Sequence, residues 1–307
     1  MRSMRHLVRI VSVFIIAIMG CFPVMAAEKL KIIASFSILA DIAKVIGGEA
    51  VDVVSLIEAG ADAHLFEPRP NDIKRLSDAD IIIMNGLGFE PWLDRFKSSS
   101  GKTPLRVMAA EGITPLDFDD HNHAVDSKSD HEIFDPHAWQ DVNNVRIYAR
   151  NIATALSARD PDHRALYNEN LARYDGALLK LDQDIRTAIA AIPPARRKLV
   201  TTHDAFGYFA RAYGITMIAP LGVAPEAQPS AKDLARIIRQ IRAEAIPAIF
   251  LETMIDPRLA QQLAAESGAK IGGTLYSDTL SAKNGPAGTY ITMMETNIRA
   301  LTDALAP

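Results

Sequence analysis

The feature that most constrains this chain is a long apolar stripe between Asp160 and Ile192. Hydrophobic residues recur there at alternating steps of three and four, which places them on one face of a helix. The stripe comprises Tyr167, Leu171, Tyr174, Leu178, Leu181, Ile185, Ile189 and Ile192. Asp160 is a good N-cap, and Pro193 ends the helix because proline lacks the amide donor. At about 1.5 Å per residue the helix would be about 48 Å long, enough to span two lobes.

The segments on either side of this helix alternate between short apolar runs and helical patterns. The predicted strands before it cover residues 30–34, 51–57, 81–84 and 105–108. Those after it cover residues 199–202, 215–219, 248–251 and 271–276. Such alternation indicates parallel sheets with right-handed crossovers, so the fold class is α/β. We expect lobes at residues 27–159 and 195–307, joined by residues 160–194.

Residues 1–26 resemble a cleaved secretory signal. Three arginines are followed by an apolar core, residues 11–19, that is too short to span a bilayer, and Ala26 suits a cleavage site. A retained anchor is one alternative, and a lipoprotein anchored through Cys21 is another. Cys21 is the only cysteine, so the mature chain would have none, and any metal would be held by His, Asp or Glu.

The charge of the chain limits its partners. The formal net charge is −4, and removing the three arginines of the signal leaves −7. This mild acidity argues against nucleic acid, which requires a basic face. It is unremarkable for a soluble secreted chain of one large domain or two ordinary ones. The predicted signal makes the periplasm the expected compartment.

Four polar side chains fall at comparable places in the predicted sheets. His64, His203 and Asp278 each follow a predicted strand, and His137 precedes a predicted helix. Ligands of parallel sheets bind beyond the carboxyl ends of the strands. A single histidine is more often structural than a ligand, but together these four would form a site with nitrogen and oxygen donors. Such a site suits a borderline divalent cation.

The segment 117–135 is too polar to pack and is predicted to be a loop. It carries His121, His123 and His131. Either these histidines gather metal loosely or the loop is simply solvated.

Several motifs resemble the metal-receptor class (zinc or manganese) of ABC-transporter periplasmic solute-binding proteins, and most closely its zinc-binding type. They are Ser35–Asp41, Ala61–Pro68, Asp80–Leu87, Asp135–Trp139, Thr202–Phe209 and Leu275–Asp278. The resemblance covers essentially the whole mature chain. Two departures are Ala63, where many members have proline after the aspartate, and Val142, where many have proline after Asp141.

This resemblance implies two lobes, each a four-stranded parallel sheet flanked by helices, joined by one rigid helix. It implies that His64, His137, His203 and Asp278 hold the metal. It also implies a receptor, not an enzyme, that delivers the ion to the permease and ATPase subunits of an ABC transporter. We expect a monomer, with a metallochaperone as a candidate partner of the histidine-bearing loop.

The third ligand indicates which metal is bound. Members of the manganese type carry glutamate there and members of the zinc type carry histidine, and this chain has His203. Three imidazoles and one carboxylate suit tetrahedral Zn²⁺, whereas manganese prefers more oxygen donors. Zn²⁺ is therefore the expected cargo, with Mn²⁺ or Fe²⁺ as the alternative.

Two other classes compete with the receptor. A zinc hydrolase keeps an open metal position for water, and four protein ligands would leave none. The sequence also has no His-Glu-x-x-His helix. A metal-binding adhesin could share the fold, and the sequence leaves that alternative open.

Groups around the ligands should orient the imidazoles. The near candidates are Asp62, Glu67, Asp135 and Asp204, although capping a turn is the plainer role for each. Trp139 would either shield the site from water or belong to the core. Glu252 ends a strand near the expected cleft, and the sequence assigns it no role.

Overall fold

The computed structural model describes residues 28–96, 98, 100–117, 134–222 and 229–306. The predicted signal with Cys21, and the loop histidines His121, His123 and His131, lie outside these residues. Among the helices that the structure describes, none combines the length and the apolar character needed to cross a bilayer.

The first sheet is parallel, with strand order β2-β1-β3-β4. Its strands are β1 (Leu30–Phe36), β2 (Val51–Ile57), β3 (Ile81–Met84) and β4 (Leu105–Met108). The helices packed around it include α2 (Ser37–Gly47) and α3 (Pro70–Asp78). Residues 32–36 of β1 are buried, as the continuous apolar character of a central strand requires.

The second sheet repeats this arrangement with strand order β6-β5-β7-β8, again parallel. Its strands are β5 (Lys198–Val200), β6 (Thr216–Ile218), β7 (Ala248–Glu252) and β8 (Lys270–Leu275). Its helices are α6 (Gly207–Tyr213), α7 (Ala231–Ala243), α8 (Arg258–Ser267) and α9 (Tyr290–Leu305). Short 3-10 helices lie at Gly48–Ala50, Leu93–Arg95, Ala138–Gln140, Pro161–His163 and Pro194–Arg196. The predicted fold class is confirmed.

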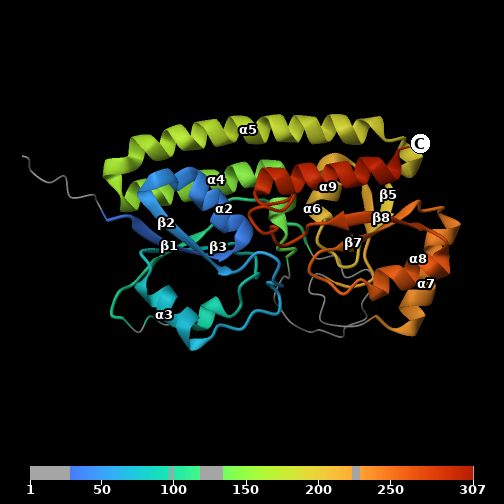
Figure 1. The fold of residues 1–307 in the computed structure, drawn as a ribbon, viewed down its shortest axis with the longest axis horizontal. Coiled ribbons are helices and arrows are strands. Elements are labelled where there is room, and N and C mark those ends of the chain that lie inside the picture. Colours follow the sequence, from blue (N-terminus) through green and yellow to red (C-terminus); the bar gives the residue numbers. More distant parts are fainter. Residues whose placement is uncertain (1–27, 97, 99, 118–133, 223–228, 307) are drawn as a thin grey trace, which may run out of the picture.

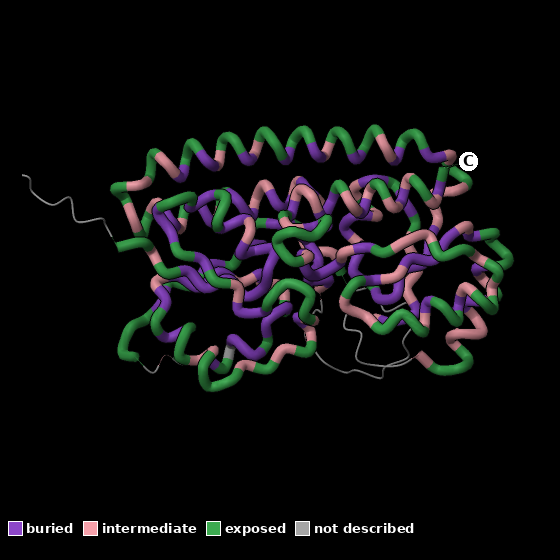
Figure 2. The backbone as a smooth tube through the Cα atoms, in the orientation of Figure 1, coloured by how far each residue is buried: buried purple, intermediate pink, exposed green. Residues whose placement is uncertain are grey.

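The long helix is α5 (Arg164–Ala191), whose 28 residues span about 42 Å. It lies across both sheets, with α4 (Val142–Arg159) beneath one end and α9 beneath the other (Figure 1). The face of α5 that is turned toward the sheets is buried (Figure 2). Of the predicted stripe, only Leu171 is partly exposed.

The predicted start of this helix at Asp160 is wrong. Residues Pro161–His163 form a separate 3-10 turn, and the Asp160 side chain makes no capping hydrogen bond. Its carboxylate accepts the Tyr167 hydroxyl and lies 2.7 Å from His163 Nδ1. The Asp160 carboxylate interacts with the side chains of His163 and Tyr167, so it does not cap the backbone amides of the helix.

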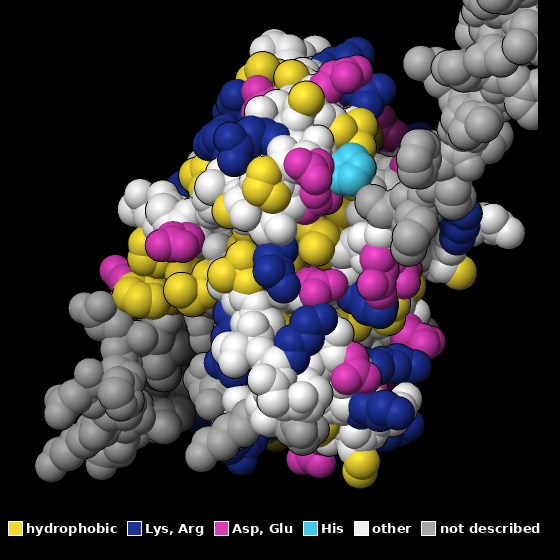
Figure 3. Space-filling view, turned by 90° about the vertical axis from the view of Figure 1, so that its left-hand side faces the viewer, with side chains coloured by type: hydrophobic (Ala, Val, Ile, Leu, Met, Phe, Trp, Pro, Cys, Tyr) yellow, Lys and Arg dark blue, Asp and Glu magenta, His cyan; other side chains and the backbone are white. Residues whose placement is uncertain are grey.

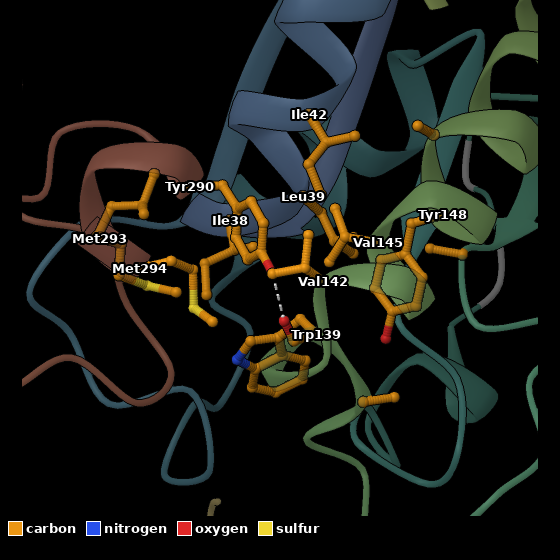
Figure 4. Packing of buried hydrophobic residues seen from close by; sticks show 14 of the residues in the cluster. Ile38, Leu39, Ile42, Trp139, Val142, Val145, Tyr148, Tyr290, Met293 and Met294 are labelled. Atoms are coloured by element: carbon orange, nitrogen blue, oxygen red, sulfur yellow. Dashed lines mark hydrogen bonds between the residues drawn. The ribbon is translucent and has the colours of Figure 1, made fainter. Parts of the chain in front are cut away.

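The hydrophobic core is continuous across the two sheets. One cluster of buried residues includes Ile32 of β1, Leu178 of α5 and Leu275 of β8. Figure 4 shows its centre, where side chains of α2, α4 and α9 meet around Trp139. The Tyr290 hydroxyl donates to the Trp139 carbonyl at 2.8 Å. This packing fixes the segment that follows His137.

The helix that follows His203, α6, begins only at Gly207. Residues 203–206 stay extended or irregular because the chain pairs with the loop after β6. The Leu221 amide donates to the Thr202 carbonyl, and the Asp204 amide donates to the Gly222 carbonyl. His203 is therefore held on a bridge between two segments rather than on a helix.

The end of the molecule that carries the first sheet has a mixed surface. Figure 3 shows lysine and arginine interspersed with aspartate and glutamate on this face, around scattered hydrophobic side chains.

Candidate metal centre

All four predicted ligands come together at the carboxyl ends of the two sheets. His64 lies in the loop after β2 and His137 precedes the 3-10 helix at residues 138–140. His203 follows β5 and Asp278 follows β8. One nitrogen or oxygen atom from each side chain lies within 4.8 Å of the others. Segments more than 200 residues apart in sequence thus meet at one point, as the strand pattern predicted.

The distances in this His3Asp cluster suit a single small cation. His64 Nε2 lies 3.3 Å from His137 Nε2, and Asp278 Oδ2 lies 3.3 Å from His64 Nε2 and 3.2 Å from His203 Nε2. Asp278 Oδ1 lies 3.5 Å from His137 Nε2. With metal–ligand bonds of about 2.0 Å, the corners of a tetrahedron are about 3.3 Å apart. Four donors at these spacings leave room for one ion at their centre.

A carboxylate stands behind His137. Asp135 Oδ1 accepts the His137 backbone N–H at 2.9 Å and lies 2.7 Å from its Nδ1. The interaction directs Nε2 into the cluster, which is the usual arrangement for a metal-binding histidine. Of the four candidates for this orienting role, Asp135 therefore meets the expectation. Asp204 and Glu67 are exposed.

Glu252 is the carboxylate that orients His203, a role that the sequence did not indicate. Glu252 Oε2 lies 2.6 Å from His203 Nδ1. Its Oε1 accepts the backbone N–H groups of Thr202 and His203 at 2.8 and 2.9 Å. The only sequence signal was its place at the end of a strand, and β7 proves to be the neighbour of β5.

His64 is held less firmly than the other two imidazoles. Asp62 Oδ1 accepts its backbone N–H at 2.8 Å, so Asp62 shapes the loop. The ring packs edge-on against Phe89, with centroids 5.1 Å apart. Of the four predicted ligands, His64 alone is not fully buried.

Trp139 belongs to the core and also positions the loop that carries Asp278. Its side chain is fully buried, and its ring centroid lies 5.2 Å from that of His137. Its Nε1 donates to the Ser277 carbonyl at 2.8 Å, and Gln140 Nε2 donates to the same oxygen at 2.7 Å. The expected core role of Trp139 is therefore confirmed, and the hydrogen bond to the Ser277 carbonyl is an additional contact.

The electrostatics of the cluster favour a bound cation. Burial alone lowers the pKa of His203, but the carboxylates of Glu252 and Asp278 outweigh it and raise that pKa well above 6.5. Burial likewise raises the pKa of Asp278, yet the imidazoles of His137 and His203 hold it well below its usual range. Buried carboxylates that hold positive charge nearby provide a site for a divalent ion, which then replaces protons.

Known proteins share this sequence and fold. Residues 32–304 match the family described as ZnuA, zinc-uptake complex component A, periplasmic. The iron-binding protein YfeA of Yersinia pestis is 36% identical over 272 residues, covering 89% of this chain and 85% of that protein. The manganese ABC transporter substrate-binding lipoprotein PsaA of Streptococcus pneumoniae is 30% identical over 286 residues, covering 91% and 90%.

Solved structures agree. The periplasmic zinc-binding protein TroA of Treponema pallidum superposes with a TM-score of 0.82 at 30% identity, covering 91% of this chain and all of that one. A manganese-bound periplasmic metal-binding protein from Candidatus Liberibacter asiaticus gives 0.79 at 31%, covering 90% of this chain and all of that one. The chain therefore belongs to the ZnuA family of metal-binding periplasmic solute-binding proteins of ABC transporters.

Proposed function

We propose that this protein captures Zn²⁺ outside the cytoplasm and delivers it to an ABC permease for uptake. His64, His137, His203 and Asp278 hold the ion as cargo. The observation that carries the proposal is the donor set, because three imidazoles and one carboxylate lie within 4.8 Å of one another, and Asp278 lies 3.2–3.5 Å from a nitrogen of each imidazole. Membership of the family makes the chain the substrate-binding component of an ABC metal-uptake system.

A second candidate cargo is Mn²⁺ or Fe²⁺. Both carboxylate oxygens of Asp278 face imidazole nitrogens, Oδ1 toward His137 and Oδ2 toward His64 and His203. A bidentate carboxylate would give five donors, and manganese prefers a larger, oxygen-richer shell than zinc. Relatives named as iron and manganese binders support this candidate.

The site supports capture rather than hydrolysis. A catalytic zinc keeps three protein ligands and an open position for water, whereas this cluster offers four protein donors to a tetrahedral ion. The relatives named above are transport and binding proteins.

We assign residues 27–159 to an N-terminal lobe, 160–194 to the linking helix and 195–307 to a C-terminal lobe. The two separate sheets and the position of α5 over both support this division. For export we favour a signal that is cleaved after Ala26. The lipoprotein names of several relatives support the other route, lipidation of Cys21, and the mass of the mature chain distinguishes the two.

Competition between metals tests the cargo. The purified chain is stripped of metal and equilibrated with Zn²⁺ against Mn²⁺ and, under anaerobic conditions, against Fe²⁺. We expect zinc to be retained in large excess over manganese, with the same order in the control variant His163→Ala, whose imidazole pairs with Asp160 outside the cluster. Retention of manganese or iron over zinc would reassign the cargo. Failure of a deletion strain to grow in zinc-poor medium, restored by zinc, tests uptake itself.

A further inference from the structure

The contact between Glu252 and His203 carries an inference that rests on the proposed function. Glu252 is 3% exposed, and the paired side-chain groups are fully buried. A buried charge without partners is costly, and Glu252 has partners in the His203 ring and in the backbone amides of Thr202 and His203. Its two oxygens have different partners. Oε1 accepts hydrogen bonds from the backbone amides of Thr202 and His203, and Oε2 lies next to His203 Nδ1.

The chemistry of imidazole makes this arrangement selective. A neutral imidazole carries one proton, and the other nitrogen has the lone pair that binds metal. Glu252 can only accept hydrogen bonds, so the proton of His203 belongs on Nδ1, where it faces Oε2. The lone pair of Nε2 is then directed at the centre of the cluster, 3.2 Å from Asp278 Oδ2.

We propose that Glu252 is a positioning residue that fixes both the ring orientation and the tautomer of His203, so that Nε2 is ready to bind the cargo ion. Asp135 has the matching contacts with His137, since it accepts the backbone N–H and faces Nδ1. Two imidazoles, one held within each half of the chain, are thus oriented before the ion arrives. His64, on its less buried loop, is the ligand left to adjust.

Only a carboxylate can make both sets of contacts. A glutamine at position 252 could offer its carbonyl oxygen to the two backbone amides, but its NH2 group would then face Nδ1. The ring proton would move to Nε2 and block the metal. If the glutamine turned round, it would orient the ring but leave two buried backbone N–H groups facing a donor.

The test therefore uses Glu252→Gln, with Glu90→Gln as the matched control. Glu90 is equally buried and accepts the Asn85 amide and the Ser35 hydroxyl, so its substitution also removes a buried carboxylate. Zinc affinity is measured by competition with a chelator. The tautomer of His203 is read by nitrogen-15 NMR of the metal-free chain at a pH high enough for the ring to be neutral, because the pKa of His203 is raised. Glu252→Asp keeps the acid and tests recovery if the glutamine variant folds poorly.

We expect Glu252→Gln to bind zinc about 10- to 100-fold more weakly and to carry its His203 proton on Nε2. Glu90→Gln should bind within a few-fold of the unsubstituted chain, and Glu252→Asp should bind more tightly than Glu252→Gln. An unchanged affinity in Glu252→Gln, an equal loss in Glu90→Gln, or a His203 proton that stays on Nδ1 would overturn the proposal. Failure of the unsubstituted chain to bind zinc would instead contradict the proposed function.

Discussion

The Thr279 hydroxyl accepts the Gly60 backbone N–H at 2.7 Å, a contact that joins the loop of Asp278 to the loop of His64. Next to it, the Leu280 amide donates to Ser37 Oγ at 2.9 Å. The loop that follows the last strand of the second sheet is therefore held by residues around the first sheet. Because Asp278 precedes Thr279, its position depends on both halves of the chain.

Thr279→Val should weaken both folding and zinc binding, because it removes the acceptor of the Gly60 amide while keeping the side-chain volume. The expected loss in free energy of unfolding is about 1–2 kcal/mol, measured by urea denaturation. The control is Thr187→Val on the exposed side of α5, where the hydroxyl bonds only within its own helix, to the Gln183 carbonyl. Equal losses in the two variants would show that the contact between the loops has no special role.

His203→Glu should shift the metal preference from zinc toward manganese. The change replaces an imidazole by a carboxylate, and oxygen donors suit manganese better than zinc. We expect the ratio of zinc to manganese affinity to fall by at least about tenfold, measured by competition titration. A variant that keeps the original ratio would mean that His203 does not set selectivity.

Zinc affinity should fall as the pH decreases, and the fall should begin above pH 6.5. The pKa of His203 is raised by Glu252 and Asp278 against the effect of burial, so its imidazole remains protonated at a higher pH than an ordinary one. Zinc must displace that proton, which costs about a factor of ten in affinity per pH unit below the raised pKa. Titrations at a series of pH values measure this. Constant affinity between pH 7.5 and 5.5 would refute it.

In the zinc-free chain, His203 should make the folded state more stable at low pH, which is the opposite of its effect on zinc affinity. A raised pKa stabilises the folded state fully below the unfolded value near 6.5, and this contribution is lost as the pH rises through the folded pKa. Thermal unfolding of the zinc-free chain should therefore show a lower melting temperature at pH 8 than at pH 6, and an equal or higher value at pH 8 would contradict this.

Zinc should change the overall shape very little. The helix α5 lies over both sheets and one hydrophobic cluster continues between them, so wide hinge closure would break buried packing. Solution scattering with and without zinc should show a radius of gyration that changes by less than about 1 Å. Large compaction on zinc addition would contradict the rigid arrangement.

The sequence allowed most of the fold to be predicted because its elements are set by local patterns. The stripe of α5 and the buried runs of β1 and β7 reflect burial directly, so their periodicity indicated helix and strand. Strand ends also indicated where His64, His203 and Asp278 would lie. The family resemblance then singled out these residues as ligands.

The contacts that orient the ligands could not be predicted in this way. Glu252 is 49 residues from His203, and Thr279 is 219 residues from Gly60. Both pairs depend on which strands become neighbours and on how loops cross, which periodicity does not specify. Asp135 was easier to find because it lies two residues from His137, within reach of a single turn.

The four-residue metal site is tested most directly by the number of zinc ions bound per chain in a buffer of low free zinc. We expect one zinc per chain in the unsubstituted protein and in His163→Ala. We expect almost none in His137→Ala, since His137 is buried at the centre of the cluster. A full zinc ion retained by His137→Ala would show that the metal is held elsewhere and would contradict the proposed site.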